Sequence, residues 1–158
     1  MSDSSSLPGQ IPDYLERLFQ VSKAKNNRKL AVILVADVVG YSKAMERNEN
    51  RTLASFKDCR AVFETLVDEY GGRIFNTAGE SFLTEFQSAV AAVEFGAAFQ
   101  TKMLERNQAV DLEDQLRFRI GVNTGDVVID GENLYGDGVN VAARLEALAQ
   151  AEGVCISR

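Results

Sequence analysis

The sequence contains no histidine, and only two cysteines and two prolines among its 158 residues. Without histidine the chain cannot build a Ser-His-Asp triad, a Cys-His dyad or an HExxH zinc site. Acid–base and metal chemistry would have to use carboxylates, amides, lysine, arginine, tyrosine or water. Cys59 and Cys155 are too few for a zinc site, and Cys59 falls on the apolar face of a predicted helix, where we expect a buried thiol.

Long apolar runs and an excess of positive charge are also missing. The longest apolar run, Leu30 to Ala36, is too short to span a bilayer. The N-terminal residues lack the cationic and apolar regions of a signal peptide. Seventeen Lys and Arg against 23 Asp and Glu give a formal net charge of −6, which disfavours binding to a nucleic-acid duplex. We therefore expect a cytoplasmic protein with no membrane and no nucleic-acid partner.

The remaining composition is that of an ordinary globular domain. Hydrophobic residues make up 46% and charged residues 25%, and the chain is long enough to bury one core. Residues 1 to about 12 are polar and carry both prolines, which predicts a disordered leader. Tyr14 to Lys25 could form a short amphipathic helix, either a lead-in for signalling or dimer formation or a helix packed on the domain. We therefore divide the chain into a leader with this helix over 1–28 and one domain over 29–158.

Hydrophobic periodicity predicts alternating strands and helices along that domain. The apolar run Leu30 to Ala36 is typical of a strand covered on both faces. Further strands are predicted over 73–77, 82–86, 116–122, 127–129 and 154–157, and helices over 50–70, 88–106 and 138–150. In this pattern Asn123-Thr124-Gly125 is a turn, and the expected inward-facing helix residues include Leu53, Val93 and Ala97. The order of elements predicts an α+β layered sandwich.

Two acidic residues stand where strands end. Asp37 follows the apolar strand, where an ionised carboxylate needs a partner or a metal, and the turn after it could hold phosphate with backbone N–H groups. An N-cap role for Asp37 on the next helix is equally compatible. Glu80 lies in the tight turn 78–81, and a carboxylate pair of this kind can hold hard divalent cations beside a triphosphate. A solvent-facing turn residue is the alternative for Glu80.

Asn140 and Arg144 lie four residues apart and hence on one helical face. Arginine suits a clamp on a phosphoryl transition state because its guanidinium cannot lose its charge. An isolated Asn–Arg pair is otherwise a surface hydrogen bond. Asp137 precedes the same helix, and we interpret it as the N-cap rather than as a catalytic residue.

Three segments in this order, LAVILVADVVGYS, GGRIFNTAGESFLTEF and RFRIGVNTGDVVIDGENLYGDGVNVAARLEAL, resemble the class III nucleotidyl cyclase catalytic domain. The resemblance covers Lys29 to Arg158 and is to the bacterial type with the YGDGVNVAARLE signature. It implies a ferredoxin-like α+β fold and a head-to-tail homodimer with active sites shared between subunits. It also implies conversion of a purine nucleoside triphosphate to a 3′,5′-cyclic nucleotide and pyrophosphate with two Mg²⁺ or Mn²⁺ ions.

The resemblance further implies roles for individual residues. Asp37, the Val38 carbonyl and Glu80 would hold the metal ions, and the backbone of the turn would contact the triphosphate. Asn140 and Arg144 would orient the ribose and stabilise the pentavalent phosphorus. The full set of positions with nucleotide-binding roles comprises Val38, Val39, Gly40, Tyr41, Ser42, Asn76 and Asn133. One subunit would contribute Asp37 and Glu80, and its partner the asparagines and the arginine.

Three of these positions depart from the family pattern. Glu80 stands where the family has its second metal-binding Asp, Asn76 where adenylate cyclases have a purine-reading Lys, and Asn133 where this bacterial type usually has Asp. Neither asparagine chooses adenine over guanine. The family normally continues through further strands after Val154, so the domain is expected to be truncated at its C-terminus. Two functions follow: a cyclase of reduced activity that uses ATP more than GTP, or a catalytically degenerate cyclase-like signalling module that binds a nucleotide or a partner without turnover.

Overall fold

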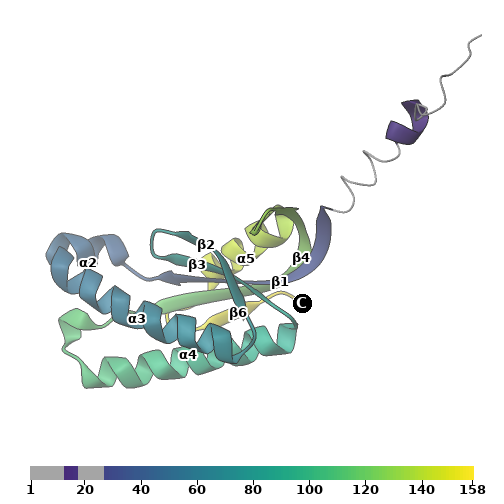
Figure 1. The fold of residues 1–158 in the computed structure, drawn as a ribbon. Helices are drawn as coiled ribbons and strands as arrows, with labels where there is room; N and C mark the ends of the chain where they lie inside the picture. The colour runs from purple at the N-terminus through teal and green to yellow at the C-terminus, as the bar shows by residue number, and fades with distance from the viewer. Residues whose placement is uncertain (1–12, 18–26) are drawn as a thin grey trace, which may run out of the picture.

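A computed structural model describes residues 13–17 and 27–158 (Figure 1). The domain contains β1 (Arg28–Val38), α2 (Tyr41–Arg47), α3 (Glu49–Glu69), β2 (Arg73–Ala78), β3 (Ser81–Phe86), α4 (Ala89–Ala109), a 3₁₀ turn η1 (Leu112–Asp114), β4 (Phe118–Asp130), β5 (Asn133–Tyr135), α5 (Asp137–Leu148) and β6 (Val154–Ile156). The predicted leader over 1–12 lies outside the described residues. Of the predicted helix Tyr14 to Lys25, residues 13–17 include helical positions and 18–26 lie outside the described residues.

One six-stranded sheet organises the domain, in the order β2-β3-β1-β4-β5 with β6 added beside β4. All pairs are antiparallel except β4 with β6. Even-numbered residues of the central strand β1 pack with α3 and α4, and odd-numbered residues pack with α5. Figure 1 shows these helices on the two sides of the sheet. This is the α+β layered sandwich that the order of elements predicts.

The two long helices begin at side-chain caps and cover one face of the sheet. Asn48 accepts a hydrogen bond from Arg51 N at 3.1 Å, and Ser88 accepts one from Ala91 N at 3.1 Å. Beneath these helices Phe63 stacks on Phe82 with ring centroids 4.4 Å apart and meets Phe95 edge-on at 4.9 Å. Cys59 is buried in the same core, as expected, and burial raises the pKa of its thiol to about 11.

The turn predicted at Asn123-Thr124-Gly125 is wrong, because β4 runs unbroken through it. All eleven residues of β1 have partners on β4, with Val32 opposite Thr124 and Ala31 opposite Gly125. Asn123 Nδ2 donates to the Gly138 carbonyl at 3.0 Å, and a Cβ on Gly125 would lie 3.1 Å from Gly138 Cα. The two residues therefore serve the contact between β4 and α5 instead of reversing the chain.

Several helix residues expected to face inward are exposed. Leu53 and Val93 are 45% and 37% exposed, and Ala97 is exposed as well. On α3 the buried positions include Thr52 and Ser55, whose hydroxyls donate to backbone carbonyls of Ala44 and Asp114. On α4, Phe95 and Phe99 fill the core instead. Apolar residues of α4 lie on several sides of the helix, so their spacing alone does not predict which face is buried.

Within residues 13–17 and 27–158, none of the helices has the length and hydrophobicity that crossing a bilayer requires.

Candidate functional site

Asp37 is the penultimate residue of β1 and lies on the α5 side of the sheet, in the same row as Ile33 and Val35. Its carboxylate Oδ1 accepts a hydrogen bond from the Ser81 hydroxyl at 2.8 Å. Ser81 opens β3, and the register of β1 with β3 places Phe82 opposite Ala36. The structure therefore brings Asp37 beside the residue that follows Glu80. The N-cap alternative for Asp37 is wrong, because the cap of α2 is Gly40 and no side chain bonds to it.

Glu80 is held in a two-residue hairpin turn. Ala78 pairs with Ser81, which leaves only Gly79 and Glu80 between the strands. Gly79 has a φ of 60°, a conformation that favours glycine and is used at the first central position of type II′ hairpin turns. Burial raises the pKa of the Tyr41 hydroxyl, and the charges of Glu80 and Glu49 add to the rise. Glu80 thus interacts with the first residue of α2, at the same end of the sheet as Asp37.

In the turn from β1 into α2, the Val38 side chain packs in the core, whereas some backbone groups remain available to a ligand. The Val38 side chain is buried in the core, so its backbone carbonyl is the group it can offer to a ligand. Val39 N donates to Arg117 O at 2.8 Å, and Ala44 N donates to Gly40 O at 3.1 Å as the first bond of α2. Gly40 is exposed with a φ of 66°. The N–H groups just before Ala44, including that of Ser42, therefore lie outside the helical ladder.

The oxygen atoms at this end of the sheet suit a hard divalent cation. Two carboxylates and a backbone carbonyl are ligands that Mg²⁺ and Mn²⁺ accept. Within the described ranges, no group of three or more His, Cys, Asp or Glu residues could hold a metal ion. An ion held by Asp37, Glu80 and the Val38 carbonyl would need further ligands from phosphate and water.

Asn140 and Arg144 lie on the outer surface of α5. The helix buries Gly138, Val139, Ala142 and Glu146 against the sheet, whereas Asn140 and Arg144 are exposed on the opposite side. No hydrogen bond or ion pair joins either residue to Asp37 or Glu80 within the described part of the chain. The polar contacts of the described residues therefore link Asp37 to Ser81 but not to Asn140 or Arg144.

The start of α5 differs from the prediction in one detail. Asp137 is not the N-cap: the helix begins at Asp137, its cap is Gly136 with a φ of 105°, and no side-chain cap bond is present. A carboxylate in the first turn interacts favourably with the positive end of the helix dipole. Asp137 thus acts through its position in the first turn.

The two asparagines predicted to read the purine lie on opposite edge strands. Asn76 is opposite Leu83 and shares its face, just after an irregularity in β2. Asn133 opens β5, where its Nδ2 donates to Tyr135 Oη at 2.9 Å and its Oδ1 accepts from Leu134 N at 2.9 Å. Leu134 faces the α5 side, so its neighbour Asn133 faces away. The edges approach each other, since β2 contacts β5 and Arg73 donates to the Glu132 carbonyl (2.5 Å).

Sequence reasoning missed three residues that surround Asp37. Besides Ser81, these are Arg119, directly opposite Asp37 on β4, and Glu146 on α5. Arg119 Nε lies 3.5 Å from Glu146 Oε1. Burial raises the pKa of the Glu146 carboxyl, the charge of Asp37 raises it further, and Arg119 opposes both. Helical spacing in the sequence could have identified Glu146, because it puts this residue on the buried face of α5 together with Val139 and Ala142.

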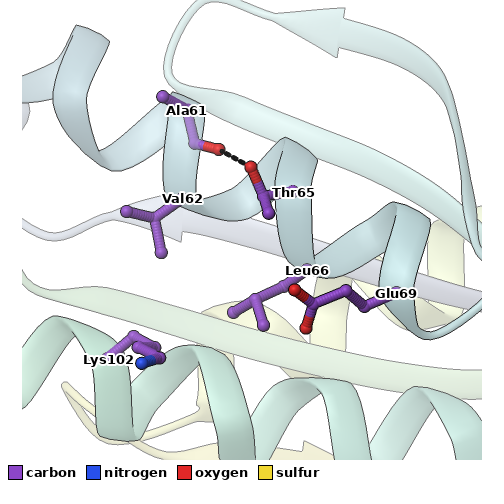
Figure 2. A pocket seen from close by; sticks show the side chains of 6 residues that line it. All are labelled: Ala61, Val62, Thr65, Leu66, Glu69 and Lys102. Atoms are coloured by element: carbon purple, nitrogen blue, oxygen red, sulfur yellow. Dashed lines mark hydrogen bonds between the residues drawn. The ribbon is translucent and has the colours of Figure 1, made fainter.

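A groove of about 500 Å³ lies between α3 and α4, away from this site (Figure 2). It is lined by Ala61, Val62, Thr65, Leu66, Glu69 and Lys102. The Thr65 hydroxyl is turned back to the Ala61 carbonyl at 2.9 Å. Because α3 and α4 cover the sheet face opposite to Asp37, the groove contains none of the predicted site residues.

Comparisons with known proteins agree with the geometry. A protein of Rhizobium meliloti (strain 1021) that carries an adenylate cyclase name is 46% identical over 141 residues, covering 87% of this chain and 24% of that protein. The adenylate cyclase of Streptomyces coelicolor is 30% identical over 82% of this chain and 32% of its own length. The chain thus spans a third or less of the length of these relatives.

Solved structures give the same result. The adenylate/guanylate cyclase/hydrolase of Silicibacter pomeroyi is 38% identical with a TM-score of 0.76, covering 82% of this chain and 76% of that one. The adenylyl cyclase CyaB of P. aeruginosa is 25% identical with a TM-score of 0.71, covering 83% and 78%. The family model for the adenylate and guanylate cyclase catalytic domain matches residues 23–158. Fold, motif order and sequence similarity together show that this chain belongs to the adenylate and guanylate cyclase catalytic domain family.

Proposed function

We propose that this domain converts a purine nucleoside triphosphate, ATP in preference to GTP, into the 3′,5′-cyclic nucleotide and pyrophosphate, with reduced activity. The observation that carries the proposal is the pairing of Asp37 with Ser81 beside the Glu80 turn, at the end of the sheet where α2 begins. The relative that is 46% identical and carries an adenylate cyclase name supports the preference for ATP. Glu80 is one methylene longer than aspartate, and a shift of about 1 Å can cost on the order of 10²-fold in rate, which supports reduced activity.

Asp37, Glu80 and the Val38 carbonyl would hold two Mg²⁺ or Mn²⁺ ions. Bound there, the ions would neutralise phosphate charge and activate the ribose 3′-hydroxyl. Ser81 donates to one oxygen of the Asp37 carboxylate, and among the described residues the other oxygen has no hydrogen-bond partner. The N–H groups of Gly40, Tyr41 and Ser42 would donate to the triphosphate, because they precede the first helical bond of α2, whereas Val39 N already donates to Arg117 O.

The exposed face of α5 would supply the groups that act on the sugar and the reacting phosphate. Arginine suits this role, and Arg144 could donate to two phosphate oxygens at once through its planar guanidinium. Asn140 lies one turn before it and would hold the ribose through its side-chain amide. Asn76 and Asn133 would contact the purine.

We further propose that the domain works as a homodimer with shared sites. Asn140 and Arg144 are exposed on the side of α5 away from its own sheet, which supports a role for them in a site on another chain. Beside α5, the sheet face around Phe75 and Leu83 is only partly buried, which leaves surface for a second copy. Asp37 and Glu80 would then come from one subunit, and Asn76, Asn133, Asn140 and Arg144 from its partner.

A second candidate is a degenerate cyclase module that binds a nucleotide or a partner without turnover. The observation that favours it is the Asn133 amide, whose donor and acceptor are both engaged within its own hairpin. Reading a purine would have to use the second N–H and the second lone pair of an amide that the hairpin already holds in place.

Product analysis separates the two candidates. Purified protein is incubated with ATP or GTP under Mn²⁺ and then Mg²⁺, and the cyclic product is measured by chromatography. Asp37→Asn and Arg144→Ala chains are each expected to be inactive, whereas an equimolar mixture regains about a quarter of wild-type activity, because half of the dimers then hold one intact site of two. A mixture that stays inactive contradicts the shared site. Nucleotide binding without any cyclic product from the wild type supports the degenerate module.

A further inference from the structure

Three charged residues lie in a row on the α5 side of the sheet. Arg119 is directly opposite Asp37 in the register of β1 and β4, which puts their Cβ atoms about 5 Å apart. Gly121 lies on the same face two residues further along, under α5, where a Cβ would be 2.2 Å from Glu146 N. From that turn of α5, Glu146 Oε1 lies 3.5 Å from Arg119 Nε. The Arg119 guanidinium thus pairs with Glu146 from the strand position directly opposite Asp37.

Stability alone does not account for the pair of Arg119 and Glu146. Glu146 is 8% exposed, and within the described ranges neither Arg119 Nε nor Glu146 Oε1 has a hydrogen-bond partner. Replacing a buried ion pair with apolar residues is often neutral or stabilising. The chain offers a direct comparison, because Arg117 Nε and Glu152 Oε1 are also 3.5 Å apart, but with side chains that are 54% and 44% exposed. The pair of Glu146 and Arg119, whose side chain is 33% exposed, joins the strand opposite Asp37 to the helix that carries Asn140 and Arg144.

We propose that Arg119 is a positioning residue shared between Asp37 and Glu146, and that it couples the charge at Asp37 to the placement of α5. The proposal rests on the proposed function, because it takes Asp37 as a metal ligand and α5 as the carrier of Asn140 and Arg144. While no cation is bound at Asp37, the Arg119 charge interacts with both the Asp37 and the Glu146 carboxylate. When a cation neutralises Asp37, the charge of Arg119 acts on Glu146 and holds α5 against β4. In a dimer with shared sites, a cation at one site would thus steady the helix that serves the other.

The first test needs neither metal nor nucleotide. Arg119→Met, Glu146→Gln and the double variant are unfolded in urea, in the wild-type background and in Asp37→Asn. We expect the coupling between positions 119 and 146 to be about tenfold in the unfolding equilibrium constant with Asp37 neutralised, and clearly smaller with Asp37 present. Arg117→Met with Glu152→Gln is the matched control, and its coupling should be the same in both backgrounds. Equal coupling of Arg119 and Glu146 in the two backgrounds overturns the sharing.

The second test uses the sign of the change in metal binding. Mn²⁺ with 3′-deoxy-ATP, which lacks the attacking hydroxyl, is titrated calorimetrically into each variant. In Glu146→Gln the Arg119 charge acts on Asp37 alone, so Mn²⁺ binding should weaken about tenfold. Arg119→Met removes a positive charge that repels the cation, so Mn²⁺ binding should become tighter. A merely structural pair would give weaker binding in both variants, and that result overturns the proposal.

The double variant keeps the second test decisive if a single variant does not fold, since it leaves no unpaired buried charge from the pair. It should bind Mn²⁺ within about threefold of the wild type, and binding as weak as in Asp37→Asn contradicts the proposal. A wild type that binds neither Mn²⁺ nor 3′-deoxy-ATP removes the proposed function. The urea measurements then still decide whether Arg119 is shared.

Discussion

Replacing Gly121 with alanine tests how closely the position of α5 controls the site. A Cβ at this position would lie 2.2 Å from Glu146 N, 2.3 Å from Ala142 O and 2.9 Å from Glu146 Cα. All three neighbours are backbone atoms of α5, so no side chain can turn away. The Cβ would be about 1 Å closer than ordinary van der Waals contact begins, and α5 must move away from β4 by a similar amount.

Two consequences of this movement can be measured separately. Overpacking of this kind costs about 1–3 kcal/mol, and we expect the free energy of unfolding in urea to fall by about 2 kcal/mol. Because Asn140 and Arg144 move with α5, cyclase turnover should fall on the order of 10²-fold in protein that is still folded. Nucleotide affinity through Asp37 should change much less, because β1 does not move.

Gly96→Ala is the matched control. Its Cβ would lie 3.3 Å from Val154 Cγ2, a side-chain methyl that can shift, and α4 carries none of the proposed site residues. We expect near-native stability and turnover for this variant. A Gly121→Ala protein with an unchanged urea midpoint and unchanged turnover would refute the reasoning that α5 is held rigidly on β4.

Further predictions address the core, the surface charges and the metal site. Phe63→Ala should lower the free energy of unfolding by about 3–5 kcal/mol in urea, because Phe63 is fully buried and contacts Phe82, Phe95 and Phe99; a loss below 1 kcal/mol would contradict the described core. The hydrogen bond from Arg51 lowers the pKa of Asp114. The stability that this interaction contributes is therefore fully present above the ordinary aspartate pKa of 3.8, and it is lost as the pH falls through the lowered pKa. Thermal melts of the wild type should therefore lose more stability in acid than those of Arg51→Met, and parallel pH profiles would count against the link. Glu80→Asp should raise the rate of cyclic nucleotide formation more with Mg²⁺ than with Mn²⁺, because Mg²⁺ is stricter about octahedral geometry; no change with either ion would show that the longer side chain is harmless. Asp37→Asn should abolish metal-dependent binding of 3′-deoxy-ATP in calorimetry, and equal affinity with the wild type would remove Asp37 from the metal site.

The sequence by itself determined most of the elements and the family. The apolar run Leu30 to Ala36 predicted a strand covered on both faces, and Ala31 to Ala36 are buried in β1. Gly79 set the hairpin turn through its own backbone freedom. The order of three motifs, each with its own residues and spacing, carried the resemblance that the comparisons confirm. All of these features depend on residues near one another in the chain.

The tertiary structure alone decided how distant residues meet. Asn123-Thr124-Gly125 has the composition of a turn, but pairing with β1 and the approach of α5 keep it extended. Spacing predicted that Asn140 and Arg144 share a helix face, yet only packing on β4 shows that this face points outward. Arg119 and Glu146 are separated by 27 residues in the numbering of the chain and become neighbours only when α5 lies on β4. Short-range preferences select the local conformation of each segment, whereas burial against the rest of the fold selects which side of it becomes a site.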